Sequence, residues 1–194
     1  MVMNKKLIVI EGFDRSGKDT LMQDLCKMNL PNTYVYFNNL EGLPSYDKEQ
    51  DNFLDWLNDF ITNQIKTINK LFDKYDTVIM TRFLMSDEVY SNLFNREHTC
   101  IKYLSDLRKD IYIVNFCILF KDYDEYLDRI NNIKEDIQYS KKDFDKICKL
   151  YMNELEKSEY HNIKVLCKIE SKATKENILE NFLSIYNYDF NKYL

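Results

Sequence analysis

The chain has 194 residues, a formal net charge of −5 and an apolar share of 45%, which fits one α/β domain over residues 1–194. The acidic balance argues against nucleic acid as a partner, because binding a phosphate backbone needs a basic face. No apolar run approaches the roughly 20 residues of a membrane span. The N-terminus shows no signal-peptide pattern, so we expect a cytoplasmic protein with no membrane partner. Five scattered cysteines and two histidines indicate neither a disulfide framework nor a zinc site.

Apolar runs of strand length alternate along the chain with segments of helical period, which is typical of a parallel sheet with helices on both faces. In chain order, strands are predicted at 7–10, 34–37, 77–80, 113–120 and 164–169. Helices are predicted at 18–29, 52–74, 86–95, 101–109, 123–131, 142–157 and 174–186. The expected fold is a three-layer α/β/α P-loop fold with a five-stranded parallel sheet and a short lid. Ligands should then bind at the carboxyl ends of the strands.

A phosphate-binding loop is predicted between the first strand and the first helix. The segment E-G-F-D-R-S-G-K-D-T places G-x-x-x-x-G-K in that position, which is the setting of a P-loop. Average usage would give about 14 glycines in a chain of this length, yet there are three, and two stand in this motif. A plain strand-to-helix turn would not explain that. The residues predicted to bind ATP here are Gly12, Asp14, Arg15, Ser16, Gly17, Lys18, Asp19 and Thr20.

The chemistry of the loop follows from its backbone and its lysine. Glycines let successive N–H groups turn toward the phosphates, and the helix N-terminus adds its dipole. Lys18 is expected to reach the β and γ oxygens. The residue after the lysine is Asp19, where the motif has a Ser or Thr hydroxyl that ligates magnesium. A carboxylate can ligate Mg²⁺ but repels phosphate without it, so we expect strict dependence on Mg²⁺.

These residues resemble the phosphate loop of thymidylate kinases, which carries E-G-x-D-x-x-G-K-[ST]-T. The family's second motif, D-R-[YFH]-x-x-S-x-x-x-Y, is similar to T-R-F-L-M-S-D-E-V-Y at 81–90. Segment 116–130 resembles the family's strand and helix before the lid. Segments 134–151 and 165–178 resemble the lid with its following helix and the last strand with the adenine loop. The short lid looks closest to phage and prophage members.

The resemblance implies a kinase that transfers the γ-phosphoryl of ATP to a deoxynucleoside monophosphate, dTMP, and that forms a homodimer. It implies that Asp14 meets the sugar 3′-hydroxyl, that Arg15 meets the transferred phosphoryl, and that Arg82 holds the acceptor's phosphate. Arg15, Lys18 and Arg82 would be the catalytic residues. The remaining implied contacts are Phe60, Ser86 and Tyr90 in the acceptor pocket, and Arg129 and Lys172 beside adenine.

The sequence departs from the family pattern at three places. Thr81 stands where the family has Asp, and no arginine follows Phe60, where the chain has Asn63 and Gln64. The loop at 38–44 lacks the family's basic residue. Because the chain gains a carboxylate at Asp19 and loses one at Thr81, we hypothesise a swap in which Asp19 ligates Mg²⁺ and Thr81 supplies the hydroxyl.

Two other functions remain open on the sequence alone. A deoxynucleoside kinase would need a carboxylate base for the 5′-hydroxyl, for which Glu41 is the candidate. A nucleotide-binding protein without turnover would follow if Asp19 spoils the metal site. Individual assignments also have plain alternatives, since Phe60 and Tyr90 could be core aromatics and Arg129 could face solvent.

Overall fold

The computed structural model describes residues 5–37, 50–96, 103–130, 138–156, 167–170 and 174–188. Five strands form one sheet in the order β2-β3-β1-β4-β5, and every neighbouring pair is parallel. Their bounds are β1 (Lys5–Gly12), β2 (Thr33–Tyr36), β3 (Thr77–Thr81), β4 (Ile111–Leu119) and β5 (Cys167–Glu170). The predicted five-stranded parallel sheet is confirmed. Because β1 is the central strand, the loop that follows it opens at the middle of the sheet's carboxyl edge.

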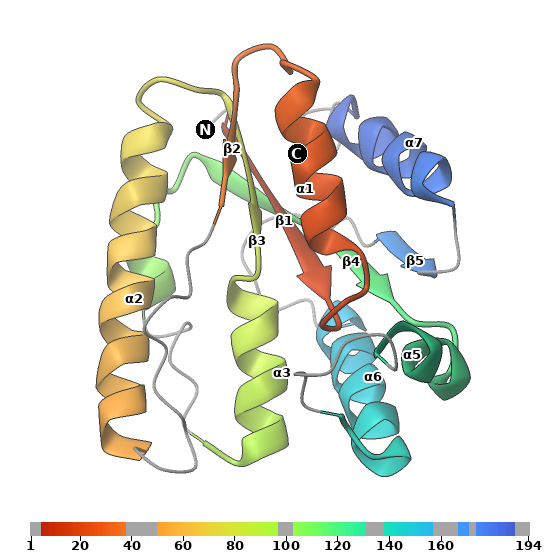
Figure 1. Ribbon diagram of the computed structural model, residues 1–194. Coiled ribbons are helices and arrows are strands. Elements are labelled where there is room, and N and C mark those ends of the chain that lie inside the picture. Colours follow the sequence, from red (N-terminus) through yellow and green to blue (C-terminus); the bar gives the residue numbers. More distant parts are fainter. Residues whose placement is uncertain are drawn as a thin grey trace.

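Helices cover both faces of the sheet, as expected for a three-layer fold (Figure 1). Helices α1 (Lys18–Lys27) and α7 (Lys175–Tyr186) pack on one face, where Ile8 and Ile10 of β1 point. The opposite face, with Leu7 and Val9, carries α2 (Gln50–Leu71). The remaining helices are α3 (Leu84–Phe94), α5 (Tyr123–Ile130) and α6 (Lys141–Glu156). They gather near the end of β4 around the buried ring of Phe13.

The helix predicted at 101–109 is wrong within the described residues. Leu104–Asp106 form only a short 3-10 helix, and β4 begins soon after it. The cause is a tertiary contact, because the side-chain amide of Asn69 on α2 accepts from the Arg108 N–H at 3.1 Å and donates to the Asp106 carbonyl at 2.8 Å. These bonds satisfy backbone groups that a helix would otherwise pair.

Some predicted features fall outside the described residues, among them Glu41, Lys172, most of the lid predicted at 131–140, and the start of the strand predicted at 164–169. The other predicted elements agree with the observed ones to within a few residues. In the part of the chain that the structure describes, no helix has the length and apolar character needed to cross a bilayer.

Gly12, the last residue of β1, lies against β4 with no room for a side chain. Its φ is +129°, and a Cβ built there would stand 2.0 Å from the carbonyl oxygen of Ile118. Gly17 also has a positive φ of +101°, but nothing lies within 4 Å of its Cβ position. The two glycines of the motif therefore meet different constraints: close packing and backbone conformation at Gly12, but backbone conformation alone at Gly17.

We predict that Gly12→Ala lowers the free energy of unfolding by about 3 kcal/mol or more, because it adds overpacking to backbone strain. Gly17→Ala is the matched control and should cost only about 1–2 kcal/mol of backbone strain. Urea unfolding of the two variants beside the parent chain gives the comparison. Equal losses would contradict the close approach of β1 and β4 as the governing constraint.

Candidate active site

The phosphate loop runs from the end of β1 to the start of α1. Gly17 caps α1 in a left-handed conformation without any side-chain cap, so the first N–H groups of the helix are left for a ligand. Ser16 is fully buried, and its hydroxyl has no hydrogen-bond partner in the described structure. A buried hydroxyl without a partner is costly. Its position beside open helix N–H groups suits an anion.

Lys18 lies inside the loop and is almost fully buried. Its Nζ donates to the Gly12 carbonyl oxygen at 3.0 Å and also to the carbonyl oxygen of Phe13. Burial lowers the pKa of Lys18 to about 8, although the charges of Asp19 and Glu11 act in the opposite direction. The loop therefore holds a cation that its surroundings only partly stabilise, which favours binding of an anion.

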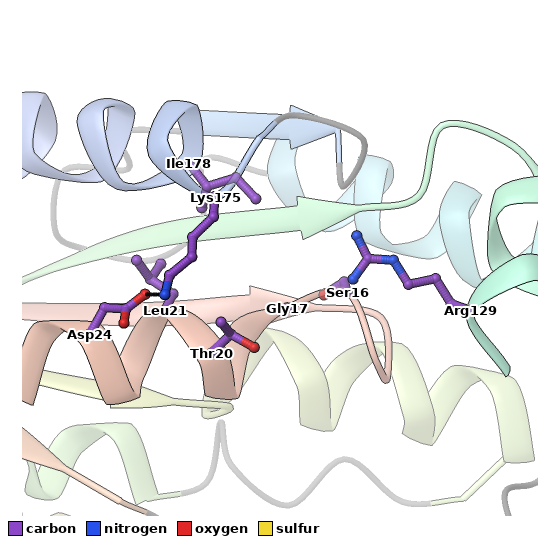
Figure 2. Close-up of a pocket in the computed structure, with 8 residues that line it drawn as sticks. All are labelled: Ser16, Gly17, Thr20, Leu21, Asp24, Arg129, Lys175 and Ile178. Atoms are coloured by element: carbon purple, nitrogen blue, oxygen red, sulfur yellow. Dashed lines mark ion pairs between the residues drawn. The ribbon is translucent and has the colours of Figure 1, made fainter. Parts of the chain in front are cut away.

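A pocket opens on the outer side of the loop, between α1, α5 and α7. It is lined by Ser16, Gly17, Thr20, Leu21, Asp24, Arg129, Lys175 and Ile178. Figure 2 shows the guanidinium of Arg129 extending from α5 toward Ser16. Across the pocket, the Nζ of Lys175 lies 2.9 Å from a carboxylate oxygen of Asp24. Residues from three separate helices thus meet beside the loop.

A second polar cluster lies where β3 ends and α3 begins. Arg82, which directly follows β3, has a positive φ of 53°, and its guanidinium forms an ion pair with Asp14 of the phosphate loop. The Tyr90 hydroxyl donates to the other carboxylate oxygen of Asp14 at 3.5 Å. Burial raises the pKa of Tyr90 well above its ordinary value, so its phenol stays a donor. Arg82 and Asp14 keep about a third of their side-chain surface exposed, so a ligand can reach them.

Glu11, the residue before Gly12, ties this cluster to the sheet. It is fully buried and accepts from the Phe83 N–H at 2.9 Å and from the Ser86 hydroxyl. Burial raises its pKa. Ser86, predicted to line the acceptor pocket, turns its hydroxyl toward Glu11 and lies 3.3 Å from the Tyr151 hydroxyl.

The structure also describes Phe60, Asp19 and Thr81 of the predicted site. Phe60 stacks on Trp56 with ring centroids 4.9 Å apart and packs on the core cluster that contains Phe83. Asp19 is exposed in the first turn of α1, whereas Thr81 is buried at the end of β3. The described residues include no group of three or more His, Cys, Asp or Glu that could hold a metal ion.

Sequence reasoning assigned no role to Glu11, Tyr151 or Lys175. A signal for Glu11 was present, since it is the only charged residue in an otherwise apolar run, L-I-V-I-E-G. Lys175 stands in the first turn of α7, three residues after the predicted Lys172. Tyr151 is one of fifteen tyrosines, and the sequence carries no sign that its hydroxyl reaches the loop.

Comparisons with known proteins define the class of fold. No protein-family model and no curated protein matches the chain, but many solved structures do. Deoxyadenosine kinase from M. mycoides with bound dATP has a TM-score of 0.63 and 15% identity, covering 94% of this chain and 100% of that chain. Thymidylate kinase from Candida albicans has a TM-score of 0.60 and 14% identity, covering 97% and 93%.

The YorR protein from Bacillus subtilis, in complex with phosphorylated GDP, has a TM-score of 0.59 and 16% identity, covering 97% of this chain and 98% of that chain. The TM-scores demonstrate a shared fold, and at identities this low they demonstrate the fold alone. The chain therefore has the three-layer fold of the P-loop nucleoside and nucleotide kinases, over almost the whole length of these neighbours.

The buried charge of Lys18 should leave a pH signature in the nucleotide-free protein. Its pKa is about 8 in the folded chain and ordinarily 10.5, so between these values the unfolded chain binds more protons and the free energy of unfolding rises with pH. The rise should be on the order of 3 kcal/mol. Lys18→Met should remove this rise with pH.

Urea unfolding at pH 7 to 10 measures this effect as the difference between the parent and the variant, which cancels other titrating groups. Lys27→Met, at an exposed position on the same helix, is the matched control and should keep the rise. A parent chain whose difference from Lys18→Met does not change with pH would contradict a destabilised ammonium in the loop.

Proposed function

We propose that the chain is an ATP-dependent kinase that transfers the γ-phosphoryl group to a deoxynucleoside monophosphate, dTMP, giving dTDP and ADP. The observation that carries the proposal is the ion pair between Arg82 and Asp14. Asp14 belongs to the phosphate loop itself, so a cation suited to an acceptor's phosphate stands directly beside the loop that would hold the donor's phosphates. Tyr90 adds a hydroxyl donor to the same place.

The donor would occupy the loop and the adjoining pocket. The unpartnered hydroxyl of Ser16 and the N–H groups at the start of α1 would receive phosphate oxygens. Arg129, which lines the same pocket, would flank adenine, and Lys172 is its predicted partner in that role. The fold neighbours support a nucleotide ligand, since their structures contain dATP, dCTP and phosphorylated GDP.

Transfer would rest on positioning and on positive charge, because phosphoryl transfer needs little covalent help. Lys18 would leave its carbonyl partners for the β and γ oxygens. Arg15, exposed in the loop with φ 65°, would meet the transferred phosphoryl. Asp14 would hold the acceptor's 3′-hydroxyl while Arg82 turns its guanidinium to the acceptor's phosphate.

Magnesium fits this arrangement through Asp19. The ion is commonly held by one or two carboxylates together with substrate phosphates and water, and Asp19 is an exposed carboxylate next to Lys18 in the first turn of α1. Bound there, Mg²⁺ would offset the charge of the phosphates. Thr81 is proposed as the source of the hydroxyl that the loop lacks after Lys18. The homodimer implied by the family resemblance remains a prediction.

A deoxynucleoside kinase is the second candidate, and solved deoxyadenosine kinases share the fold. The decisive experiment is a coupled ADP-release assay with dTMP, thymidine and the other deoxynucleosides and their monophosphates as acceptors. We expect turnover with dTMP and little with thymidine. Turnover with nucleosides alone would establish the second candidate. If none of these acceptors supports ADP release, both candidates are rejected.

We predict that Arg82→Gln raises the Michaelis constant for dTMP at least about tenfold, since a charge-assisted bond contributes about 1.5–3 kcal/mol. The constant for ATP should stay within about twofold, since Arg82 is assigned to the acceptor alone. Initial rates with each substrate varied in turn give both constants. Arg108→Gln, which removes an arginine paired with Asp110 and Asp73, is the control and should change neither. An unchanged constant for dTMP would remove Arg82 from the acceptor site.

The metal proposal predicts non-additive effects at Asp19 and Thr81. Asp19→Ser should raise the Mg²⁺ concentration needed for half-maximal rate, and adding Thr81→Asp should recover much of the loss. Titrations of the rate with Mg²⁺ for the parent, both single variants and the double variant complete the cycle. If Asp19→Ser alone leaves the Mg²⁺ requirement unchanged, Asp19 is not a ligand and the swap is wrong.

A further inference from the structure

The carbonyl oxygen of Gly12 accepts two side-chain hydrogen bonds. The Nζ of Lys18 and the hydroxyl of Tyr151 each lie 3.0 Å from it. A carbonyl oxygen has two lone pairs, so both donors can bind at once. Tyr151 comes from α6 and is fully buried, and Lys18 is nearly so. No other pair of side chains from α1 and α6 has a described hydrogen bond to one backbone atom.

Only one of these two donors is free to leave. Lys18 cannot satisfy the Gly12 and Phe13 carbonyls and also reach the phosphates of a bound nucleotide, which is the role of the lysine in such a loop. A buried carbonyl that loses its donor costs about 1–3 kcal/mol. Without a second donor, that cost would count against nucleotide binding.

Tyr151 is fixed in its position by the buried cluster around it. Its hydroxyl lies 3.3 Å from the Ser86 hydroxyl, which itself donates to Glu11. Glu11 also accepts from the Phe83 N–H, so hydrogen bonds join the start of α3 to the end of β1. Tyr151 itself is held beside them by its full burial in the core cluster around Phe13. Burial raises the pKa of Tyr151, which keeps the phenol protonated and able to donate.

We infer that Tyr151 is a positioning residue of the phosphate loop, whose hydroxyl keeps the Gly12 carbonyl bonded when Lys18 turns to the nucleotide's phosphates. The hydrogen bond from Tyr151 remains and holds the end of β1 in place while the lysine moves. The inference rests on the phosphate loop as a nucleotide site and not on the acceptor, so it stands for a nucleoside or a nucleotide kinase alike.

The test is a double-mutant cycle between Tyr151→Phe and Lys18→Met, read by ADP affinity in calorimetry at fixed Mg²⁺. In the parent chain, Tyr151→Phe should raise the dissociation constant for ADP about 5- to 30-fold, since binding then leaves the carbonyl without a donor. In the Lys18→Met background no donor departs, and the same change should alter the constant less than about twofold. Tyr112→Phe, another buried tyrosine distant from the loop on β4, should leave it unchanged in both.

Urea unfolding without nucleotide gives a second, independent reading. Tyr151→Phe alone should lower the urea midpoint little, because Lys18 still serves the carbonyl. In the Lys18→Met background it should lower the midpoint clearly more, and a double variant that does not fold is the extreme of that result.

Three outcomes would overturn the inference: equal changes in the two backgrounds, no change in ADP affinity in the parent, or a Tyr151→Phe chain that does not fold. Each would make the hydroxyl purely structural or irrelevant to the loop. An acceptor assay that fails would leave this result untouched, so the two proposals fail separately.

Discussion

The contact between Gly12 and β4 is the constraint on which the site depends. β1 is the central strand, and at its last residue the neighbouring strand comes so close that no side chain fits. The chain must leave the sheet at this point, and it leaves with its carbonyl facing inward to Lys18 and Tyr151. The loop is thus attached to the sheet through a residue that contacts the backbone of β4 on one side and two buried donors through its carbonyl.

The residues around that position carry buried charge in the middle of an apolar core. Glu11 and Lys18 flank the loop at either end. Burial raises the pKa of Glu11 and lowers that of Lys18, so it favours the neutral form of each. Such groups cost stability, and the free chain meets part of the cost with hydrogen bonds to backbone groups. Sites that bind charged ligands often retain this kind of local instability because the ligand relieves it. Of these two groups, Lys18 is the one whose cost an anion such as phosphate would offset.

Much of the fold could be predicted from the sequence because its strands are buried on both faces. Such strands read as largely apolar runs, and the strands Lys5–Gly12, Thr77–Thr81 and Ile111–Leu119 each contain one. The segment at 101–109 failed because its backbone partners come from Asn69, 35 or more residues earlier. A local pattern holds no information on a side chain that arrives from another helix.

The same distinction between local pattern and tertiary contact applies to the site residues. The loop and Arg82 could be found because glycine and arginine are scarce in this chain and stand in motif positions, and the structure pairs Arg82 with Asp14. Tyr151 could not be found, because its role depends on how α6 packs against the end of β1. Whether a given tyrosine hydroxyl meets water or a carbonyl is decided by that packing, and fifteen tyrosines look alike in sequence.

Under the proposed function the phosphate loop would contact two ligands, and two separate polar clusters adjoin it. Asp14 turns to Arg82 and Tyr90 on the α3 side, whereas Ser16 and Gly17 line the pocket between α1, α5 and α7. Lys18 is bonded to the backbone of Gly12 and Phe13 in the same loop. In-line transfer requires donor and acceptor to approach the moving phosphoryl from opposite directions. Under the proposed function, the cluster of Asp14, Arg82 and Tyr90 would hold the acceptor and the pocket beside Ser16 and Gly17 would hold the donor. The two ligands would then approach one loop from two separate sites.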